Sequence, residues 1–305
     1  MRMGIFGGEL GQGDGGIDEL VKAVAESRDQ GFDSYWLPQI FGLDALTALA
    51  VVGREVDRIE LGTSVIPTYP RHPVMLASQA LTVQSTIGDR LALGIGLSHQ
   101  VVIEQMFGYS FDKPVRHMRE YLTVLRALFD ERNVQFKGES LSAMAPSTVS
   151  GAVPSPRILV AALGTQMLRL TGKLADGTIT WMTGPATLAE HTIPTLKSAA
   201  AEAGRSDDVR VVAGFPVCVT DDADAARGRA AQVFAVYGTL PSYRAMLDRE
   251  GAAGPADVAL VGDEKTVAVG IEQLRDAGVT DFLAAEFGAT DAEISRTREL
   301  LRNLL

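Results

Sequence analysis

The sequence has a single cysteine, Cys218, so an intramolecular disulfide is impossible. This cysteine usage is typical of a reducing compartment. Cys218 stands in the apolar run GFPVCVT, which favours a buried structural thiol over a nucleophile. The fold must therefore depend on a hydrophobic core, and 46% hydrophobic residues in a chain of 305 are enough to form one.

The chain also lacks long hydrophobic runs. No segment approaches the roughly 18 uninterrupted apolar residues that a membrane-spanning helix needs. The N-terminal stretch MRMGIFGGEL meets glycines and an acidic residue too early to supply the apolar region of a signal peptide. We therefore expect a soluble, cytoplasmic protein with no membrane partner.

Basic residues are too few and too dispersed to form a nucleic-acid surface. The formal net charge is -10, from 38 acidic and 28 basic residues. Phosphate backbones are bound by concentrated positive charge, so we expect no nucleic-acid partner. A small anionic molecule would need a local site that works against the overall field.

Two kinds of catalytic motif are absent as well. The four histidines, His72, His99, His117 and His191, form no close ligand motif, and the cysteine lies far along the chain, so no metal site is expected. The sequence also has no nucleophile signature of a Ser-His-Asp hydrolase.

What the chain does contain is a repeated alternation of short apolar runs and longer segments of helical period. MGIFGG is followed by IDELVKAVAESRDQGF, whose apolar residues share one helical face and whose helix ends at Gly31. Similar pairs repeat until about eight strands have each been followed by a helix. The expected fold is an α/β (β/α)8 TIM barrel that forms one domain over residues 1–305. An open doubly wound sheet is the alternative.

Two insertions interrupt this alternation. Residues from about 132 to 156, after the fourth helix, are rich in turn residues, and residues 238–257 follow the seventh helix. We expect both insertions to overhang the barrel mouth, by which we mean the C-terminal end of the strands. There they would select the substrate.

The strand exits are where a barrel carries its function. Here they contain many glycines, several histidines and both tryptophans, Trp36 and Trp181. This mixture suits a flat aromatic cofactor with a phosphorylated tail. The tryptophans would either stack near the ring of that cofactor or fill the upper layer of the barrel.

Two of the exits have the chemistry of a phosphate site. GIGLSH (residues 94–99) lets backbone amides approach an anion, and Ser98 adds a hydroxyl donor. LGTQM (residues 163–167) does the same at a helix start, with Thr165 as a candidate N-cap. Either turn can equally be a simple helix start. GIGLSH lacks the third glycine and the downstream acid of a dinucleotide fingerprint, which argues against a Rossmann site.

The segment RIELGTSVIPTYPRHPVMLASQALTVQSTIGDRLALGIGLSH resembles the third strand, third helix and fourth strand of the bacterial luciferase-like oxidoreductases, particularly their deazaflavin-dependent members. GFDSYWLPQIFGLDALTALA and HMREYLTVLRALFDE extend the resemblance to nearly the whole chain. It implies a TIM barrel that binds coenzyme F420 or, in other branches, FMN. It also implies a homodimer.

The resemblance assigns cofactor-binding roles to particular residues. Ser64 and Val65 fall where such proteins have a bulge with a non-prolyl cis peptide that backs the cofactor ring; a trans strand followed by a proline-rich turn is the alternative. The residues assigned to the ribityl and phosphate side are Gly94, Gly96, Leu97, Ser98, Gly164 and Thr165. Arg71 and His72 either contact the anionic tail or a substrate, or belong to the scaffold as caps of the helix.

The family pattern fails at the exit of the second strand. Many relatives have an acid–histidine pair there, whereas this chain has Gln39 and Ile40, which cannot exchange a proton at neutral pH. Gln39 would hydrogen-bond the cofactor ring or a substrate carbonyl, or serve as a structural amide. Candidate proton donors are Glu9, Tyr69, His72, His99, Tyr109 and a solvent molecule. We favour Glu9 or His99 because both lie at strand exits.

These observations lead to three hypotheses of function. The first is a coenzyme F420-dependent oxidoreductase that transfers a hydride between C5 of the deazaflavin and a small organic substrate. The second is a reduced-FMN-dependent monooxygenase on the same fold. The third is a cofactor-binding protein with little catalysis, which the missing acid–histidine pair keeps open.

Overall fold

The computed structural model describes residues 1–8, 16–146, 149, 154–206 and 208–305. Within these residues, eight parallel strands pair in sequence around a closed ring, and the last of them returns to the first. They are β1 (Arg2–Phe6), β2 (Ser34–Leu37), β3 (Glu60–Thr63), β5 (Leu91–Gly96), β8 (Arg157–Ala161), β9 (Gly177–Trp181), β10 (Arg210–Val219) and β12 (Asp281–Glu286). The closure confirms the TIM barrel and excludes an open doubly wound sheet.

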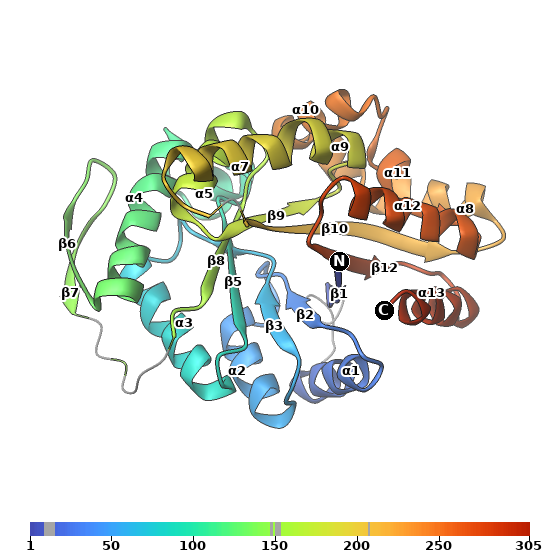
Figure 1. The fold of residues 1–305 in the computed structure, drawn as a ribbon, viewed down its shortest axis with the longest axis horizontal. Coiled ribbons are helices and arrows are strands. Elements are labelled where there is room, and N and C mark those ends of the chain that lie inside the picture. Colours follow the sequence, from blue (N-terminus) through green and yellow to red (C-terminus); the bar gives the residue numbers. More distant parts are fainter. Residues whose placement is uncertain (9–15, 147–148, 150–153, 207) are drawn as a thin grey trace.

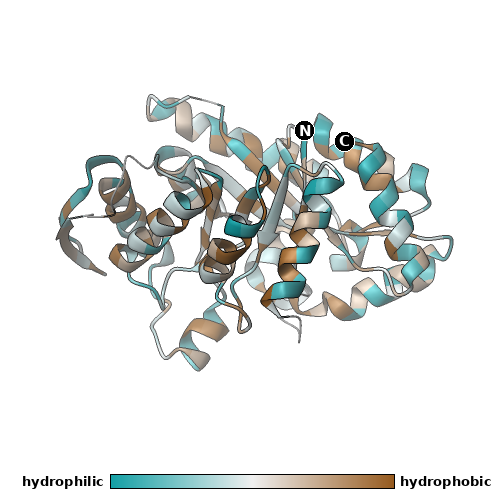
Figure 2. Ribbon diagram, turned by 90° about the horizontal axis from the view of Figure 1, so that it is seen from below, coloured by the Kyte–Doolittle hydropathy of each residue, from teal (hydrophilic) through white to brown (hydrophobic). Residues whose placement is uncertain are grey.

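Helices surround the strands, as Figure 1 shows. Those that follow a barrel strand are α1 (Ile17–Asp29), α2 (Ala45–Glu55), α3 (Pro73–Ile87), α4 (Pro114–Arg126), α5 (Thr165–Leu174), α7 (Ile193–Glu202), α8 (Ala223–Val233) and α13 (Asp291–Asn303). The short helix α6 (Pro185–Thr187) leads through a π-helical turn into α7, and α12 (Glu264–Asp276) precedes β12. The helices mix hydrophobic and hydrophilic residues (Figure 2), as expected where only one face packs on the strands. None of the helices in the described part is long and apolar enough to cross a membrane.

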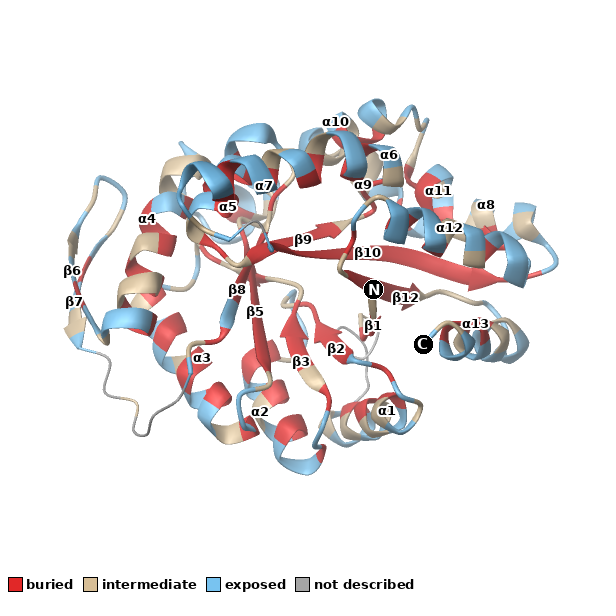
Figure 3. Cartoon of the chain, viewed as in Figure 1, coloured by how far each residue is buried: buried red, intermediate tan, exposed pale blue. Residues whose placement is uncertain are grey.

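The barrel interior is a packed core rather than a channel. Six buried side chains fill it: Trp36, Ala92, Leu159, Ile179, Val212 and Leu283. The largest is Trp36. It fits only because residue 62 on β3 is glycine, since a Cβ at Gly62 would lie 2.1 Å from the Trp36 ring. Trp36 thus fills the barrel, one of the two roles considered for it. The strands are the most continuously buried part of the chain (Figure 3).

Charged groups close the N-terminal end of the barrel. Arg210, which is buried, donates to both carboxylates nearest it, with 2.6 Å contacts to Glu60 and to Asp281. Arg2 adds a 2.8 Å ion pair to Glu60. The Arg210 guanidinium also lies over the Trp36 ring, at 5.5 Å from its centroid. Ion pairs occupy this end, so the opposite end is the one left to bind ligands.

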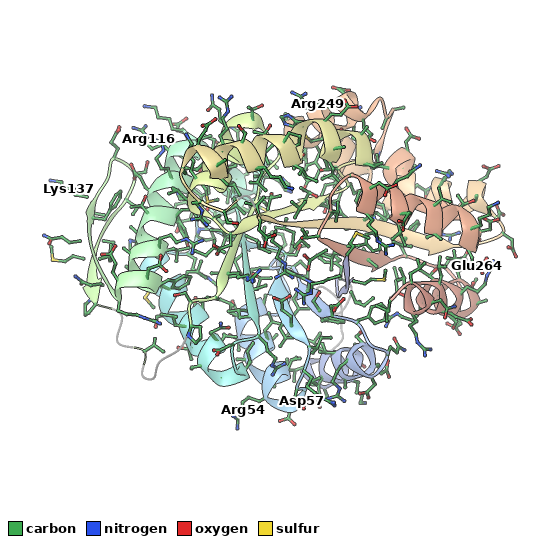
Figure 4. The ribbon with its side chains drawn as sticks, in the orientation of Figure 1. Arg54, Asp57, Arg116, Lys137, Arg249 and Glu264 are labelled. Carbon is green, nitrogen blue, oxygen red and sulfur yellow. The ribbon has the colours of Figure 1, made fainter. Side chains whose placement is uncertain are left out.

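The described residues of the first insertion do not overhang the mouth, so that expectation is wrong for them. It forms an antiparallel hairpin of β6 (Asn133–Lys137) and β7 (Ser142–Pro146) on the outer side of α4 (Figure 1). The Glu120 carboxylate on α4 accepts hydrogen bonds from the amides of residues 139, 140 and 141 at 2.8 to 3.0 Å. Lys137 points away from the protein, while Arg116 on α4 pairs with Glu139 (Figure 4).

The second insertion is helical. It begins in α9 (Ala235–Thr239), contains α10 (Pro241–Glu250) and ends in α11 (Pro255–Val258), and the short strand β11 (Leu260–Gly262) follows it. β11 pairs with the end of β10 outside the closed ring, because β10 is long enough to extend beyond the barrel. The sequence analysis did not expect this additional strand. Cys218 lies on this part of β10 and is buried, as predicted.

Candidate functional site

The exit of β3 contains the predicted cis peptide, between Ser64 and Val65. It separates β3 from the short strand β4 (Ile66–Pro67), and both pair with β5. Leu61 pairs with Leu91, an offset of 30, whereas Ile66 pairs with Ile95, an offset of 29. One extra residue therefore lies on the β3–β4 side, which is the predicted bulge.

Two glycines of β5 make room for this bulge. A Cβ at Gly94 would lie 1.9 Å from the Thr63 carbonyl oxygen, and one at Gly96 would lie 2.7 Å from Cγ2 of Val65. The Thr63 hydroxyl donates to the Gly94 carbonyl at 2.8 Å and accepts from the Gly94 amide at 2.9 Å. The Gly94 amide is therefore engaged within the protein, and contact of either glycine with a cofactor stays a prediction.

The residues after β5 turn toward the mouth. Leu97 and Ser98 are half-buried, and Ser98 has a left-handed backbone with φ of 61°. Burial lowers the pKa of His99, so its imidazole is neutral at pH 7. No hydrogen bond to its ring is found among the described residues. Its one ring contact there is edge-on to Tyr243 of α10, with 6.0 Å between centroids.

The start of α5 is open. Gly164 is its N-cap rather than Thr165, and no side chain caps the helix. Gly164 and Thr165 are both exposed. Unpaired amides at a helix start, together with the helix dipole, favour an anion there. Because α5 follows β8, which pairs with β5, this open start lies at the exit next to the bulge and its glycines.

The start of α6, one exit further on, is closed by the protein itself. The Glu250 carboxylate at the end of α10 accepts from the amides of Ala186 at 3.1 Å and Thr187 at 2.7 Å. A Cβ at Gly184 would lie 2.1 Å from the Glu250 carboxyl carbon. An intramolecular anion therefore occupies the position that an external phosphate would need, and it ties α10 to the exit of β9.

Three predicted site residues make structural contacts. Arg71 donates to Asp44, the N-cap of α2, at 2.6 Å. His72 caps α3 by accepting from the Val74 amide, and its Nε2 lies 3.3 Å from a hairpin carbonyl. Gln39 accepts from the amide of residue 45 at 2.8 Å. The scaffold alternative is thus realised for each of them, although their remaining donors can still contact a ligand.

A stack of rings beside β4 was missed by the sequence analysis. Tyr69 lies flat on His117, with 4.0 Å between ring centroids and 2° between ring planes. Phe111 also stacks on Tyr69, with 5.3 Å between centroids. Nε2 of His117 is 2.9 Å from the Thr68 hydroxyl. Burial lowers the pKa of His117 to about 4, and burial with nearby acids raises that of Tyr69 to about 12. Tyr69 therefore does not ionise at neutral pH.

The other candidate proton donors are placed as follows. Glu9 lies outside the described residues, so its role stays a prediction. Tyr109 is exposed on the loop after β5. No group of three or more His, Cys, Asp or Glu side chains in the described ranges is arranged to hold a metal ion.

The second insertion reaches the mouth through Tyr243 of α10, whose ring contacts His99. It completes what we call the aromatic arch: Phe6, Trp181, Phe234, Tyr237, Tyr243 and Phe287, ending on His99. The ring contacts, given as distances between centroids, are Phe6–Trp181 (5.5 Å), Trp181–Phe234 (6.0 Å), Trp181–Tyr237 (6.1 Å), Tyr237–Tyr243 (5.0 Å), Phe234–Phe287 (5.8 Å) and Tyr243–His99 (6.0 Å). Trp181 belongs to the upper layer of the barrel and also faces the insertion.

A cavity of about 630 Å³ lies at the opposite end of the barrel, among Arg2, Arg28, Asp33, Glu60 and Arg90. Its arginines are engaged already: Arg90, for example, donates to the carbonyls of residues 53, 56, 59 and 87. Since barrel enzymes act at the C-terminal ends of their strands, the mouth is the better candidate for the site.

Comparison with known proteins identifies the family of the chain. Residues 2–281 match the family model of luciferase-like monooxygenases. The 5,10-methylenetetrahydromethanopterin reductase of Archaeoglobus fulgidus is 30% identical over 244 residues, which cover 78% of this chain and 71% of that protein.

Two solved structures share the fold. An F420-dependent secondary alcohol dehydrogenase in complex with an F420–acetone adduct has a TM-score of 0.79 at 19% identity and covers 98% of this chain and 97% of its own. The FMN complex of the oxygenating constituent of 3,6-diketocamphane monooxygenase from Pseudomonas putida has a TM-score of 0.78 at 18% identity, with 99% and 96% covered. The family match over most of the chain shows that this protein is an oxidoreductase belonging to the luciferase-like monooxygenase family.

Proposed function

We propose that this chain is a coenzyme F420-dependent oxidoreductase that transfers a hydride between C5 of the deazaflavin and a small organic substrate. The observation that carries the proposal is the run of three neighbouring exits: the bulge between β3 and β4, the end of β5 and the open start of α5. A flat ring against the bulge would direct a phosphorylated tail toward α5. The similarity to a methylenetetrahydromethanopterin reductase and to an F420-dependent alcohol dehydrogenase supports a deazaflavin.

The residues present fit such a cofactor. Val65 and Ala161 are partly buried on top of the barrel core and give the ring an apolar floor. The amides at the start of α5, around Gly164 and Thr165, would hold the phosphate. When bound, the coenzyme supplies the hydride chemistry, and the protein supplies position and exclusion of water.

His99 is the described residue best placed to handle a proton. Its imidazole is neutral because burial lowers its pKa, so it can accept a proton from a substrate hydroxyl that is being oxidised. In the reverse direction the same nitrogen would return the proton. Glu9 is the alternative for this role.

Equilibrium binding of cofactor-free protein to coenzyme F420 and to FMN, side by side at one ionic strength, tests the proposal. We expect a dissociation constant for F420 of about micromolar or tighter and clearly weaker binding of FMN. Tighter binding of FMN would instead favour the second candidate, a reduced-FMN-dependent monooxygenase, for which the FMN-bound neighbour is the supporting observation. Tight F420 binding without turnover of any alcohol, ketone or enone would favour the third candidate, a binding protein.

We also propose that the protein is a homodimer. Val51 on α2 and Met75 on α3 are exposed apolar side chains on adjacent helices, 42% and 59% exposed. A shared interface would cover them. Light scattering at several protein concentrations measures the mass directly, and a mass of one chain throughout would contradict the dimer.

A further inference from the structure

The aromatic arch crosses the whole barrel mouth. Phe287 follows β12, the eighth strand of the ring, and His99 follows β5, the fourth. These strands lie on opposite sides of the closed barrel. The rings between them are Trp181 from β9, Phe234 and Tyr237 from the residues just before the second insertion, and Tyr243 from the second insertion. The arch is therefore assembled from distant parts of the chain.

One buried donor within the arch has no acceptor. Nε1 of Trp181 is buried and makes no hydrogen bond, and an indole N–H can only donate. The hydroxyls of Tyr237 and Tyr243 are not among the buried unpaired groups of the described residues, so water can reach them. Buried donors in native proteins are nearly always paired, so an unpaired one needs an explanation. A ligand with an acceptor oxygen would supply the partner.

The arch is also without charge. Its six members are aromatic and uncharged, and burial raises the pKa of Tyr237 and of Tyr243 further above neutrality. Arg244 and Glu250 of α10 are engaged elsewhere: Arg244 donates to Asp248 and to two carbonyls, and Glu250 accepts from the start of α6. Arg249 of the same helix points outward (Figure 4). Such surroundings disfavour an ionic ligand and favour a neutral one.

We infer that the aromatic arch binds a neutral, planar, conjugated carbonyl compound, with the flat ring against Trp181, Tyr237 and Tyr243 and the carbonyl oxygen accepting from the Trp181 indole. Aromatic rings stack or meet edge-on at centroid distances of about 4.5 to 7 Å, and the rings of the arch already contact one another at such distances. A planar ligand would therefore pack against this set of rings and not between two of them. That this compound is the substrate rests on the proposed function. The binding itself does not.

The probe that tests the inference is 1,4-naphthoquinone, with the saturated bicyclic ketone 2-decalone as its matched control. Both are neutral ketones of two fused rings, but only the first is planar and conjugated. Calorimetric titration of the full chain, with and without bound coenzyme F420, should give naphthoquinone binding in both forms. Decalone should bind at least about tenfold more weakly, because it loses the stacking.

Three variants locate the site. Trp181→Phe keeps a ring but removes the donor and should weaken naphthoquinone binding about fivefold. The double variant Tyr237→Leu with Tyr243→Leu removes two stacking faces and should weaken it by more than about tenfold. Val236→Ala, at an exposed neighbour on α9, is the control and should leave it unchanged. Coenzyme F420 affinity, measured on the same samples, verifies that each variant is folded.

The inference is overturned if naphthoquinone fails to bind up to its solubility limit, if decalone binds equally well, or if the double variant binds as tightly as the natural chain. It is also overturned if saturating F420 displaces naphthoquinone, because the arch would then be the seat of the cofactor ring. Naphthoquinone binding to a protein that binds neither F420 nor FMN would support the arch while contradicting the proposed function.

Discussion

Both insertions interrupt the strand–helix alternation of the sequence, and they lie in different places in the structure. The first lies outside α4, where a carboxylate and backbone amides hold it. The second lies across the barrel mouth, where aromatic rings and Glu250 hold it. The difference lies in the side chains: Glu120 and Arg116 on α4 attract a hairpin tip, whereas Tyr237 and Tyr243 extend an aromatic core that begins inside the barrel. Polar contacts therefore hold the first insertion on the surface, and aromatic contacts hold the second insertion at the barrel mouth.

The largest effect should come from breaking the anchor of the first insertion. Glu120 is 7% exposed and accepts three amide hydrogen bonds, so Glu120→Ala should lower the free energy of unfolding by about 3 kcal/mol. Denaturant titration measures this. Because the hairpin is remote from the mouth, F420 affinity should change less than about twofold while the variant is folded. A large loss of F420 affinity would mean that the first insertion also belongs to the site.

The second effect concerns the stacked rings of Tyr69, His117 and Phe111 beside β4. Burial depresses the folded-state pKa of His117 to about 4 from its ordinary 6.5, so the unfolded chain binds the extra proton. The stability from the neutral ring is complete above pH 6.5 and is lost as the pH falls from about 6.5 to about 4. After allowance for the partial exposure of the ring, we expect a loss of about 2 kcal/mol over this range.

The variant His117→Phe checks this effect, because it keeps a ring against Tyr69 but cannot titrate. The difference in unfolding free energy between the two proteins should be constant above pH 6.5, and the natural chain should lose about 2 kcal/mol relative to the variant as the pH falls from about 6.5 to about 4. Parallel curves would show that another group dominates the acid sensitivity.

A third test places a carboxylate at the start of α5, as Glu250 does at the start of α6. Glu250 fills the start of α6, whereas the start of α5 is open at Thr165. Thr165→Glu would place a carboxylate at that start and should weaken F420 binding about tenfold through repulsion of its phosphate. The isosteric control Thr165→Gln should bind F420 nearly as the natural chain does. If Thr165→Glu and Thr165→Gln bind F420 equally well, the phosphate does not lie at the start of α5, and the two helix starts do not differ in this respect.

How far the sequence predicts such features depends on how local they are. The strand–helix alternation is local, and its count of about eight strands favours a barrel, whereas the pairing of β12 with β1 that closes the ring is visible only in the structure. The cis peptide at Ser64–Val65 was predicted from a motif. Gln39 and His72 cap helices within six residues of themselves, contacts that their positions before α2 and α3 allow. The arch, by contrast, joins His99 to Tyr243 and Phe6 to Trp181, and no local pattern indicates those pairs.

The glycines of β5 show a different limit. Their sequence indicates that something approaches the backbone closely, and an anion is one such partner. In the structure the close atoms are the Thr63 carbonyl oxygen at Gly94 and the Val65 side chain at Gly96. A missing Cβ creates space, but only the three-dimensional arrangement tells which neighbour fills it.

The smallest effect should come from weakening the anchor of the second insertion. Glu250→Gln keeps one acceptor for the α6 amides but removes the charge, which should cost about 1 kcal/mol of unfolding free energy. Weaker hydrogen bonds from α10 to the start of α6 should also hold Tyr243 less rigidly at the mouth, so naphthoquinone affinity should fall about threefold. Arg249→Gln, at the outward-pointing neighbour in Figure 4, is the matched control and should change neither quantity. Stability lost without any change in naphthoquinone affinity would show that the second insertion, like the first, is anchored independently of the site, and the contrast between them would then be one of position alone.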